Sequence, residues 1–332
     1  MNELLDDLPP GVRARLRPGQ AEWVPPMLAT LTEDRFSDPG WLYERKLDGE
    51  RCLIYRSNNA ADLYSRNRKQ LNNSYPELVE AIAAQQGEFV ADGEIVAFQG
   101  NSTSFARLQP RMQVSDPDAA RRSGVAVYLY LFDLLHLAGH DLTGLELRQR
   151  KALLRKAIAY HGPLRYTPHR NTEGESYWKH ACRQGWEGVI AKRADAPYAQ
   201  GRSRDWLKFK CAAEQEFVIG GYTDPQGTRI GFGALLIGYY ERGQLRYAGK
   251  VGTGYDQRTL TQLGQQLEAL ERDEPAFTGG KLPRLRVHWV EPRLVAQVGF
   301  TEWTRDGQLR HPRFQGLRRD KAPLDVVRES TR

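Results

Sequence analysis

An Asp-Gly pair between two strand-like runs constrains the fold of this chain more than any other short feature. Asp48 and Gly49 separate residues 41–46 from residues 51–55, and both flanking runs are rich in aromatic and aliphatic side chains. Asp-Gly favours tight turns and is a strong local signal for a β-hairpin. The pattern therefore predicts a hairpin, with Lys46 at the end of its first strand.

Alternating and helical patterns continue along the first two thirds of the chain. A helix is expected over 147–160, with Thr143 and Glu146 as a capping box, and a second helix over 176–183 stops at Gly185. Strands and helices mixed in this way are typical of an α+β fold with largely antiparallel sheets. Further strands are expected at 62–65, 88–98, 125–131, 188–191 and 206–210.

The pattern changes after about residue 211. Five short strands and one amphipathic helix within about 120 residues suit an OB-type β-barrel, a fold that often binds oligonucleotides. We expect three parts: a loosely attached N-terminal extension (1–24), a first domain (25–212) and an OB-fold domain (213–332). The strands are expected at 217–222, 234–240, 245–251, 286–290 and 294–300, and the helix at 256–271.

Charge and cysteine content narrow the class of protein. The net charge of +7 admits a polyanionic partner, because clustered Lys and Arg gain free energy by displacing counterions from phosphates. The acidic first residues do not resemble a signal peptide, and no apolar run is long enough to span a membrane, so a cytoplasmic protein is expected. Cys52, Cys182 and Cys211 form no CxxC pair, which favours buried thiols in a reducing compartment over zinc ligands or disulfides.

Lys46 is the candidate nucleophile. A lysine amine attacks phosphorus only when neutral, and nearby cations or burial favour that state by lowering its pKa. Taken alone, Lys46 would be interpreted as a solvated lysine beside a hairpin. Six short motifs in order change that interpretation. They are Lys46-x-Asp48-Gly49-x-Arg51, Ser65-Arg66-Asn67, Asp92-Gly93-Glu94, Phe132-Asp133-Leu134-Leu135, Glu187–Lys192 and Trp206–Lys210.

This ordered set resembles the covalent nucleotidyltransferase superfamily, which contains DNA ligases, RNA ligases and mRNA capping enzymes. The resemblance covers about residues 25–321 and implies that the first domain is an adenylation domain. It also implies that Lys46 attacks the α-phosphorus of ATP and holds AMP covalently. The other residues that it places at the nucleotide are Glu44 near the adenine, Arg51 and Glu94 near the ribose and the reacting atoms, Arg66 at the phosphates, Phe132 stacked on the base, Lys192 beside it, and Arg202, Lys208 and Lys210 on phosphate oxygens.

A divalent cation belongs to the same chemistry. The resemblance assigns Mg²⁺ or Mn²⁺ to Glu187, with Glu94 as a weaker candidate. One or two carboxylates are enough, since Mg²⁺ takes its remaining ligands from phosphate and water. Lys208 and Lys210 alternate along a strand and so face the same side, where together they would lower the pKa of Lys46 and assist catalysis.

The C-terminal segment distinguishes among the relatives. Residues 310–321 resemble the closure motif of ATP-dependent DNA ligases, and residues 250–254 resemble a DNA-facing loop of their OB domains. The whole pattern is most similar to bacterial ATP-dependent ligases, especially the ligase module of end-joining enzymes. An mRNA-capping-type guanylyltransferase, an RNA ligase or a non-catalytic nucleic-acid-binding module are the alternatives. The closure-motif residues are Arg310, Arg313, Arg318, Asp320 and Lys321.

The substrate implied by this resemblance is nicked duplex DNA. A ligase accepts any sequence, so its affinity should come from phosphate contacts rather than base readout. We expect a monomer associated with the bacterial nucleoid, and bacterial end-joining proteins are further candidate partners. The candidate DNA contacts are Arg66, Arg68, Lys69, Arg107, Arg111, Arg229 and Lys250.

Overall fold

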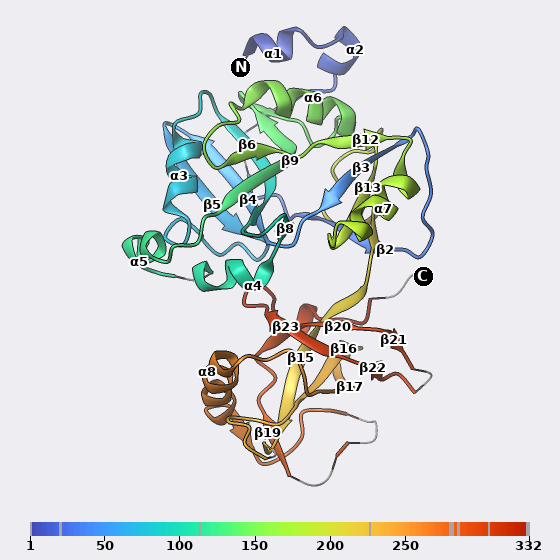
Figure 1. The fold of residues 1–332 in the computed structure, drawn as a ribbon. Helices are drawn as coiled ribbons and strands as arrows, with labels where there is room; N and C mark the ends of the chain where they lie inside the picture. Colours follow the sequence, from blue (N-terminus) through green and yellow to red (C-terminus); the bar gives the residue numbers. More distant parts are fainter. Residues whose placement is uncertain are drawn as a thin grey trace. The chain divides into compact units, whose positions relative to one another are not determined.

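The computed structural model describes residues 2–19, 22–112, 114–225, 227–278, 282–283, 286–304 and 306–329. The chain forms two compact units, of which the first ends at Cys211 and the second begins at Ala212. Each unit is built mainly from antiparallel strands with helices packed against them, which agrees with the expected α+β class (Figure 1).

Unit 1 contains two larger sheets, which we call the acceptor sheet and the flanking sheet. The acceptor sheet has the order β12-β3-β13-β14-β2, and only β14 and β2 pair in parallel. The flanking sheet has the order β1-β10-β9-β6-β4-β5, with β11 parallel to β9. The bounds are β1 Arg17–Pro18, β2 Met27–Leu31, β3 Trp41–Lys46, β4 Glu50–Ser57, β5 Ala60–Ser65, β6 Phe89–Val96, β9 Tyr128–Leu137, β10 His140–Asp141, β11 Leu164–Tyr166, β12 His169–Asn171, β13 Gly188–Arg193 and β14 Gly201–Lys210, with a small β7 (Phe98–Gln99) and β8 (Ser102–Thr103) ribbon beside them.

The predicted hairpin at Asp48-Gly49 is wrong, although both flanking strands exist. β3 pairs with β12 and β13, whereas β4 pairs with β5 and β6, so the turn carries the chain from one sheet to the other. Asp48 Oδ2 accepts a hydrogen bond from the backbone N–H of Phe105 at 2.9 Å. A Cβ at Gly49 would collide with the carbonyl of Ile95. Asp48 and Gly49 thus let the chain cross closely from one sheet to the other, and they do not form the turn of a hairpin.

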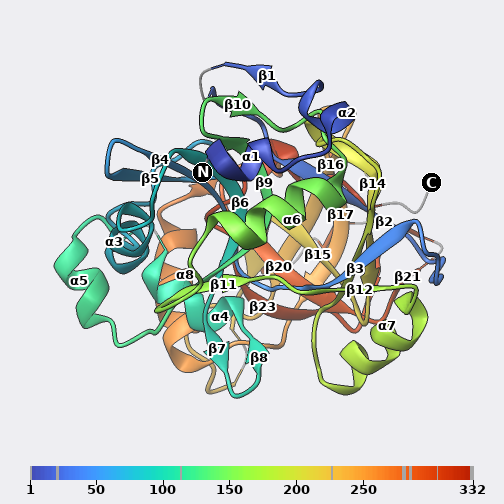
Figure 2. The same cartoon turned by 90° about the horizontal axis from the view of Figure 1, so that it is seen from above.

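Helices cover the sheets of unit 1. α6 packs against β9, and α7 packs against β3, β12 and β13 (Figure 2). The cap of α6 differs from the expectation, because Glu146, and not Thr143, is the N-cap and forms the capping box with Gln149. The helices are α1 Asn2–Asp6, α2 Pro10–Arg13, α3 Pro76–Ala83, α4 Phe105–Leu108, α5 Pro117–Arg122, α6 Leu147–Ala157 and α7 Gly174–Arg183, with the 3₁₀ turn η1 Gln109–Arg111.

The N-terminal segment is held against unit 1. Leu5 is buried in the core of the flanking sheet, and Arg17 and Pro18 of β1 pair with β10. This differs from the expected loosely attached extension, because apolar side chains of α1 and α2 have packing partners that the sequence alone does not reveal.

Cys182 and Cys211 form a disulfide, which corrects the expectation of three buried thiols. Their Cα atoms lie 5.2 Å apart, at the end of α7 and directly after β14. Only Cys52 is a free cysteine among the residues that the structure describes, and it is buried. The two cysteines are 29 residues apart in sequence, so their pairing depends on the packing of α7 against the acceptor sheet.

Unit 2 is built on a sheet of order β17-β16-β15-β19-β18, to which β20 and β23 add through β15. The expected strands and helix are present, but the pairings between described residues do not close the sheet into a barrel. The segment 313–317, assigned beforehand only to the closure motif, forms a strand paired with β20. The bounds are β15 Ala213–Thr223, β16 Leu235–Glu241, β17 Gln244–Val251, α8 Gln257–Glu268, β18 Glu271–Arg272, β19 Val287–Val290, β20 Val295–Phe300, β21 Glu302–Trp303, β22 Leu309–Arg310, β23 Arg313–Leu317 and the turn η2 Pro323–Asp325.

Candidate active site

Lys46 and Glu187 form an ion pair at one end of the acceptor sheet. Lys46 is the last residue of β3, and Glu187 directly precedes β13. Their side chains are 16% and 11% exposed, so both groups are largely withdrawn from water. The structure thus brings together the predicted nucleophile and the predicted metal ligand, which are 141 residues apart in sequence.

The register of the acceptor sheet arranges further cations around Lys46. Gly188 lies opposite both Lys46 and Lys210, and Ile190 lies opposite both Glu44 and Lys208. Residues that are directly opposite, and residues two apart on one strand, point to the same face. The two lysines of β14 therefore share the face of Lys46, as predicted.

A glycine is required at position 188 for this close packing. Gly188 has a φ of +149°, and a Cβ there would collide with the carbonyl of Phe209. Its missing side chain also leaves the row between Lys46 and Lys210 unobstructed. The conformational freedom of glycine thus serves the site as well as the strand.

Glu44 is buried between two lysines. Lys151 Nζ lies 2.5 Å from Oε1, and Lys192 Nζ lies 2.6 Å from Oε2. Burial alone would raise the pKa of Glu44, but the two ammonium groups hold it below its ordinary value. Burial also lowers the pKa of Lys192 to about 8, against the opposing effect of Glu44. Glu44 and Lys46 alternate on β3, so this charged group lies on the face of the candidate nucleophile.

Phe132 lies among aromatic and cationic groups from both sheets. Its ring centroid is 4.1 Å from Lys192 Nζ and 4.8 Å from the Arg51 guanidinium, and the edge of Trp206 packs at 6.0 Å. These distances fall in the range of cation–π attraction. The ring is 8% exposed, so the expected stacking partner of the base is also part of the core.

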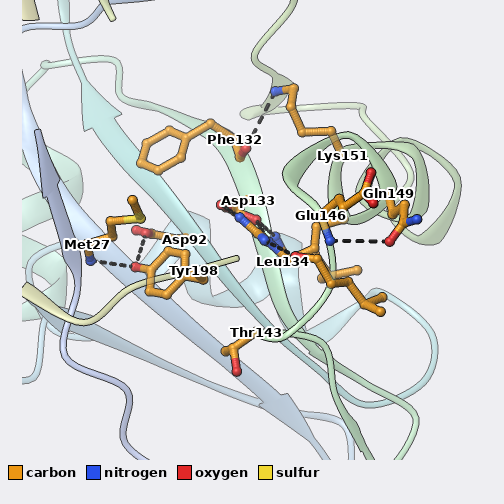
Figure 3. Close-up of polar contacts among 12 residues, drawn as sticks. Met27, Asp92, Phe132, Asp133, Leu134, Thr143, Glu146, Gln149, Lys151 and Tyr198 are labelled. Carbon is orange, nitrogen blue, oxygen red and sulfur yellow. Dashed lines mark hydrogen bonds and ion pairs between the residues drawn. The ribbon is translucent and has the colours of Figure 1, made fainter. Parts of the chain in front are cut away.

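Arg51 is fixed by a closed ring of hydrogen bonds. Its guanidinium donates to both carboxylate oxygens of Asp92 and to the carbonyl of Met27. The Tyr198 hydroxyl donates to Asp92 at 2.6 Å and accepts from the Met27 N–H at 2.9 Å (Figure 3). Burial works against the charged guanidinium, but Asp92 raises the pKa of Arg51 above its ordinary value. The ring ties β2, β4 and β6 to the loop that carries Tyr198.

Three other residues predicted to contact the nucleotide are not among the groups described above around Lys46 and Phe132. Glu94 is half-buried on β6, opposite Arg51 and Tyr130. Arg66 is half-buried in the turn after β5. Arg202 is exposed near the start of β14, where it donates to the carbonyl of Ala29 at 2.9 Å.

Most candidate DNA contacts are exposed, but one is not. Arg68, Lys69 and Arg107 on unit 1 and Lys250 on unit 2 are open to solvent, and Arg229 is half-buried, donating to the Gly252 carbonyl. Arg111 is 1% exposed and binds both carboxylate oxygens of Glu77 and the carbonyls of Ser74 and Val125. Because it holds the fold together in this way, we no longer count Arg111 among the DNA contacts.

The closure-motif residues are engaged within unit 2. Arg318 binds both oxygens of Asp320 at 2.8–2.9 Å, and Lys321 lies 3.2 Å from Glu216. Arg310 pairs with Glu302 at 2.6 Å, and Arg313 is exposed on β23. The motif thus presents cations on a strand and turn of the second sheet.

The donor chemistry of the site fits a divalent cation. Within the ranges that the structure describes, no three His, Cys, Asp or Glu side chains gather as a metal-binding group. Glu187, beside Lys46, offers the single hard oxygen donor that Mg²⁺ uses together with phosphate and water.

No helix in the described part of the chain is long and apolar enough to cross a membrane.

Sequence reasoning missed Lys151, Arg150 and Tyr198. Arg150 and Lys151 lie three and four residues after Leu147 and before Leu154, so they share the inward face of α6. That spacing was the available signal for their burial. Tyr198 has no such signal, because it follows β13 in an irregular segment.

Comparison with known proteins shows the family of this chain. A family model described as the ATP dependent DNA ligase domain matches residues 26–210, and one described as the ATP dependent DNA ligase C terminal region matches residues 228–321. The multifunctional non-homologous end joining protein LigD of Pseudomonas aeruginosa is 36% identical over 93% of this chain, and its Mycobacterium tuberculosis counterpart is 36% identical over 92%. The chain spans 37–40% of the length of these two relatives.

Solved structures give the same relationship at the level of fold. A mycobacterial DNA ligase D complexed with ATP and MES is 34% identical, with a TM-score of 0.66 over 92% of this chain and 98% of that one. The ligase domain of Mycobacterium tuberculosis LigD is 35% identical, with a TM-score of 0.50 over the same shares. These likenesses confirm a nucleotidyltransferase domain followed by an OB-fold domain. Because the first family model alone matches more than half of the chain, this protein belongs to the ATP-dependent DNA ligases.

Proposed function

We propose that this chain seals nicks in duplex DNA by carrying AMP on Lys46. Its amine attacks the α-phosphorus of ATP, so that an N–P bond forms, pyrophosphate leaves and the amine gives up a proton. The AMP then passes to the 5′-phosphate at the nick, and attack by the 3′-hydroxyl releases it as the phosphodiester forms. The observation that carries this proposal is the placement of Lys46 beside Glu187, Gly188 and Lys210.

The surrounding cations prepare Lys46 for this role. Lys208 and Lys210 share its face of the acceptor sheet, where fixed positive charge favours a neutral amine and attracts phosphate. Glu187 would hold the divalent cation, Mg²⁺ or Mn²⁺, which supplies further positive charge beside the phosphates. The ion pair between Glu187 and Lys46 places this carboxylate next to the attacking amine.

The base and ribose would be held by the groups around Phe132. Phe132 offers its ring for stacking, Glu44 and Lys192 lie beside it, and Arg51 is fixed against the ring by Asp92. Arg66, Glu94 and Arg202 are assigned to the ribose and phosphates by family resemblance.

DNA binding and pathway follow from the same family. Without the buried Arg111, the candidate DNA contacts are spread over both units. This distribution suits an interface that binds phosphates and does not depend on sequence. The named LigD relatives are end-joining proteins, so we place this chain in bacterial DNA end joining, as a monomer at the nucleoid with other end-joining proteins as partners.

The direct test follows AMP onto the chain. Wild-type protein incubated with labelled ATP and Mg²⁺ or Mn²⁺ should gain the mass of one AMP, and Lys46→Ala should gain none. Lys156→Ala, on the exposed face of α6, is the matched control and should label normally. Labelled GTP in place of ATP tests the guanylyltransferase alternative. An adduct that persists in Lys46→Ala would refute the assignment.

A further inference from the structure

Two consecutive basic residues of α6 turn into the interior of unit 1. Arg150 is fully buried and Lys151 is 1% exposed. Each binds a carboxylate beside a predicted nucleotide residue: Arg150 binds Asp133, which follows Phe132, and Lys151 binds Glu44, two residues before Lys46. Buried cations are costly unless they are paired and hydrogen-bonded, so each is held in a defined arrangement.

The two pairs have different surroundings. Arg150 binds both oxygens of Asp133 and donates to the carbonyls of Leu145 and Ala196, so it joins α6 to β9 and to the segment after β13. These contacts brace the fold and include none of the side chains predicted to touch the nucleotide.

Lys151 instead contacts the nucleotide-side groups directly. Its ammonium lies 2.5 Å from Glu44 Oε1 and 3.1 Å from the carbonyl of Thr167. It also lies 3.5 Å from the carbonyl of Phe132 (Figure 3). Three acceptors match the three N–H donors of an ammonium group. Lys151 therefore joins the Glu44 carboxylate to the backbone of the residue whose ring is expected to stack on the base.

Glu44 is held from two sides as a result. Lys151 pairs with Oε1 and Lys192 pairs with Oε2. The ammonium of Lys192 also lies against Phe132 and Trp206. Without Lys151 the carboxylate would be free to turn and would pair with Lys192 alone. It would also lose one of the two charges that keep it ionised in a buried position.

We propose that Lys151 is a positioning residue for base recognition, which sets the affinity for ATP and its preference over GTP by fixing the Glu44 carboxylate. This inference rests on the function proposed above. An ionised carboxylate accepts a hydrogen bond from the exocyclic amine of adenine, but it repels the carbonyl oxygen that guanine carries at the same place. The discrimination therefore requires a carboxylate that stays charged and keeps its direction.

The experiment measures self-adenylation of the full chain with labelled ATP or GTP. Hydrogen bonds to charged groups contribute about 1.5–3 kcal/mol, so Lys151→Met should raise KM for ATP by roughly 10- to 100-fold. The ratio of ATP to GTP labelling should fall by a similar factor. Sealing of nicked DNA that already carries 5′-AMP needs no ATP, and duplex contacts help to hold its adenine, so at saturating DNA it should fall less than self-adenylation does. Lys156→Met, on the same helix but exposed, should behave as wild type in each assay.

A double-mutant cycle separates positioning from a general effect on the fold. If Lys151 acts through Glu44, then Lys151→Met should add little to Glu44→Gln, because the carboxylate it positions is already gone. Thermal unfolding checks that each variant is folded. If Lys151→Met does not fold, Lys151→Gln, which keeps donors for the two carbonyls but not the charge, replaces it in the same comparison.

Each outcome has a defined meaning. An unchanged KM for ATP in the folded variant would overturn the proposal, as would an equal loss in adenylation and in sealing of pre-adenylated DNA. Independent effects of the two substitutions would overturn it as well. A wild-type chain that takes up no AMP would refute the proposed function itself. If the wild type is labelled normally and the Lys151 variant has the same KM for ATP, only the positioning role is refuted.

Discussion

At the residue scale, the charge of Lys192 depends on its surroundings. Its side chain is buried against Phe132 and Trp206, and burial lowers its pKa to about 8 even though Glu44 lies 2.6 Å away. An ordinary lysine has a pKa of about 10.4. Lys192 therefore changes charge in a range where the enzyme can be assayed.

This predicts a pH dependence of ATP binding. Protonated Lys192 holds the second oxygen of Glu44, so loss of its proton frees that carboxylate; KM for ATP in self-adenylation should therefore be level below pH 8 and should rise above it by up to about tenfold per pH unit. The measurement is KM between pH 7 and pH 9.5. Lys192→Arg keeps its charge over this range and should remove the rise. A rise that persists in that variant would mean that another group titrates.

At the scale of elements, α7 and β14 are joined by more than ordinary packing. The Cys182–Cys211 disulfide connects the end of α7 to the residue after Lys210, and Trp178 donates to the Lys210 carbonyl at 3.1 Å. β14, which carries Lys208 and Lys210, is thereby attached to α7 at its C-terminal end. Chain entropy gives such a cross-link a sizeable effect on stability.

We predict that reduction destabilises unit 1. The sequence separation is 29 residues, and a loop of that length corresponds to about 3–4 kcal/mol in the free energy of unfolding. Urea unfolding with and without dithiothreitol should show this difference in wild type. Cys182→Ser should match the reduced protein and show no response to the reductant. Three titratable thiols in unreduced, denatured wild type would contradict the prediction.

At the scale of the whole molecule, charge is distributed over two units with different expected tasks. Unit 1 holds the acceptor sheet and the exposed Arg68, Lys69 and Arg107. Unit 2 contributes Lys250 and the closure motif, and its Arg313 is exposed on β23. This division predicts that substitutions in the closure motif affect one reaction step, and that DNA binding by the exposed cations depends on salt.

The closure motif should matter in one step only. Arg313→Ala removes an exposed cation from β23, so the fold should be retained. Adenylation of Lys46 should slow by about tenfold or more, the size expected for a lost charged hydrogen bond, while sealing of pre-adenylated DNA should be nearly unchanged. Single-turnover rates for both steps test this. Arg242→Ala, another exposed arginine of unit 2, is the control, and a full adenylation rate in Arg313→Ala would disprove the assignment.

DNA affinity should depend strongly on salt and little on sequence. A protein that neutralises about six phosphates loses on the order of 10³-fold in affinity between ~50 and ~200 mM salt. Binding constants for two unrelated nicked duplexes across this range test both statements. Because Arg111 is buried, Arg111→Ala should lower stability, whereas Lys69→Ala should reduce the salt slope. A flat salt dependence would show that the exposed cations do not contact DNA.

Local patterns were enough for the main strands, for the helices α6, α7 and α8, and for the family, but the helices α1 to α5 and several short strands were not predicted. Periodicity reveals which backbone conformation a segment favours and which side chains share a face, and Lys208 and Lys210 follow that rule in the structure. The order of six short motifs identified the covalent nucleotidyltransferase superfamily, and the C-terminal motif identified an ATP-dependent DNA ligase within it, which the family models confirm. Lys46 and Glu187 were identified as candidates without any knowledge of their contact.

Only the tertiary structure decided how these pieces pair. Asp48-Gly49 has the local preference of a hairpin turn, but its neighbouring strands pair in different sheets, because β3 pairs with β12 and β13 far along the chain whereas β4 pairs with β5 and β6, which follow it. Arg111 was expected to contact DNA, but a carboxylate of another element meets it in the core, as Glu44 meets Lys151. The spacing on α6 indicates that Lys151 faces inward, but a sequence pattern does not record which carboxylate a buried cation meets, because that depends on long-range packing.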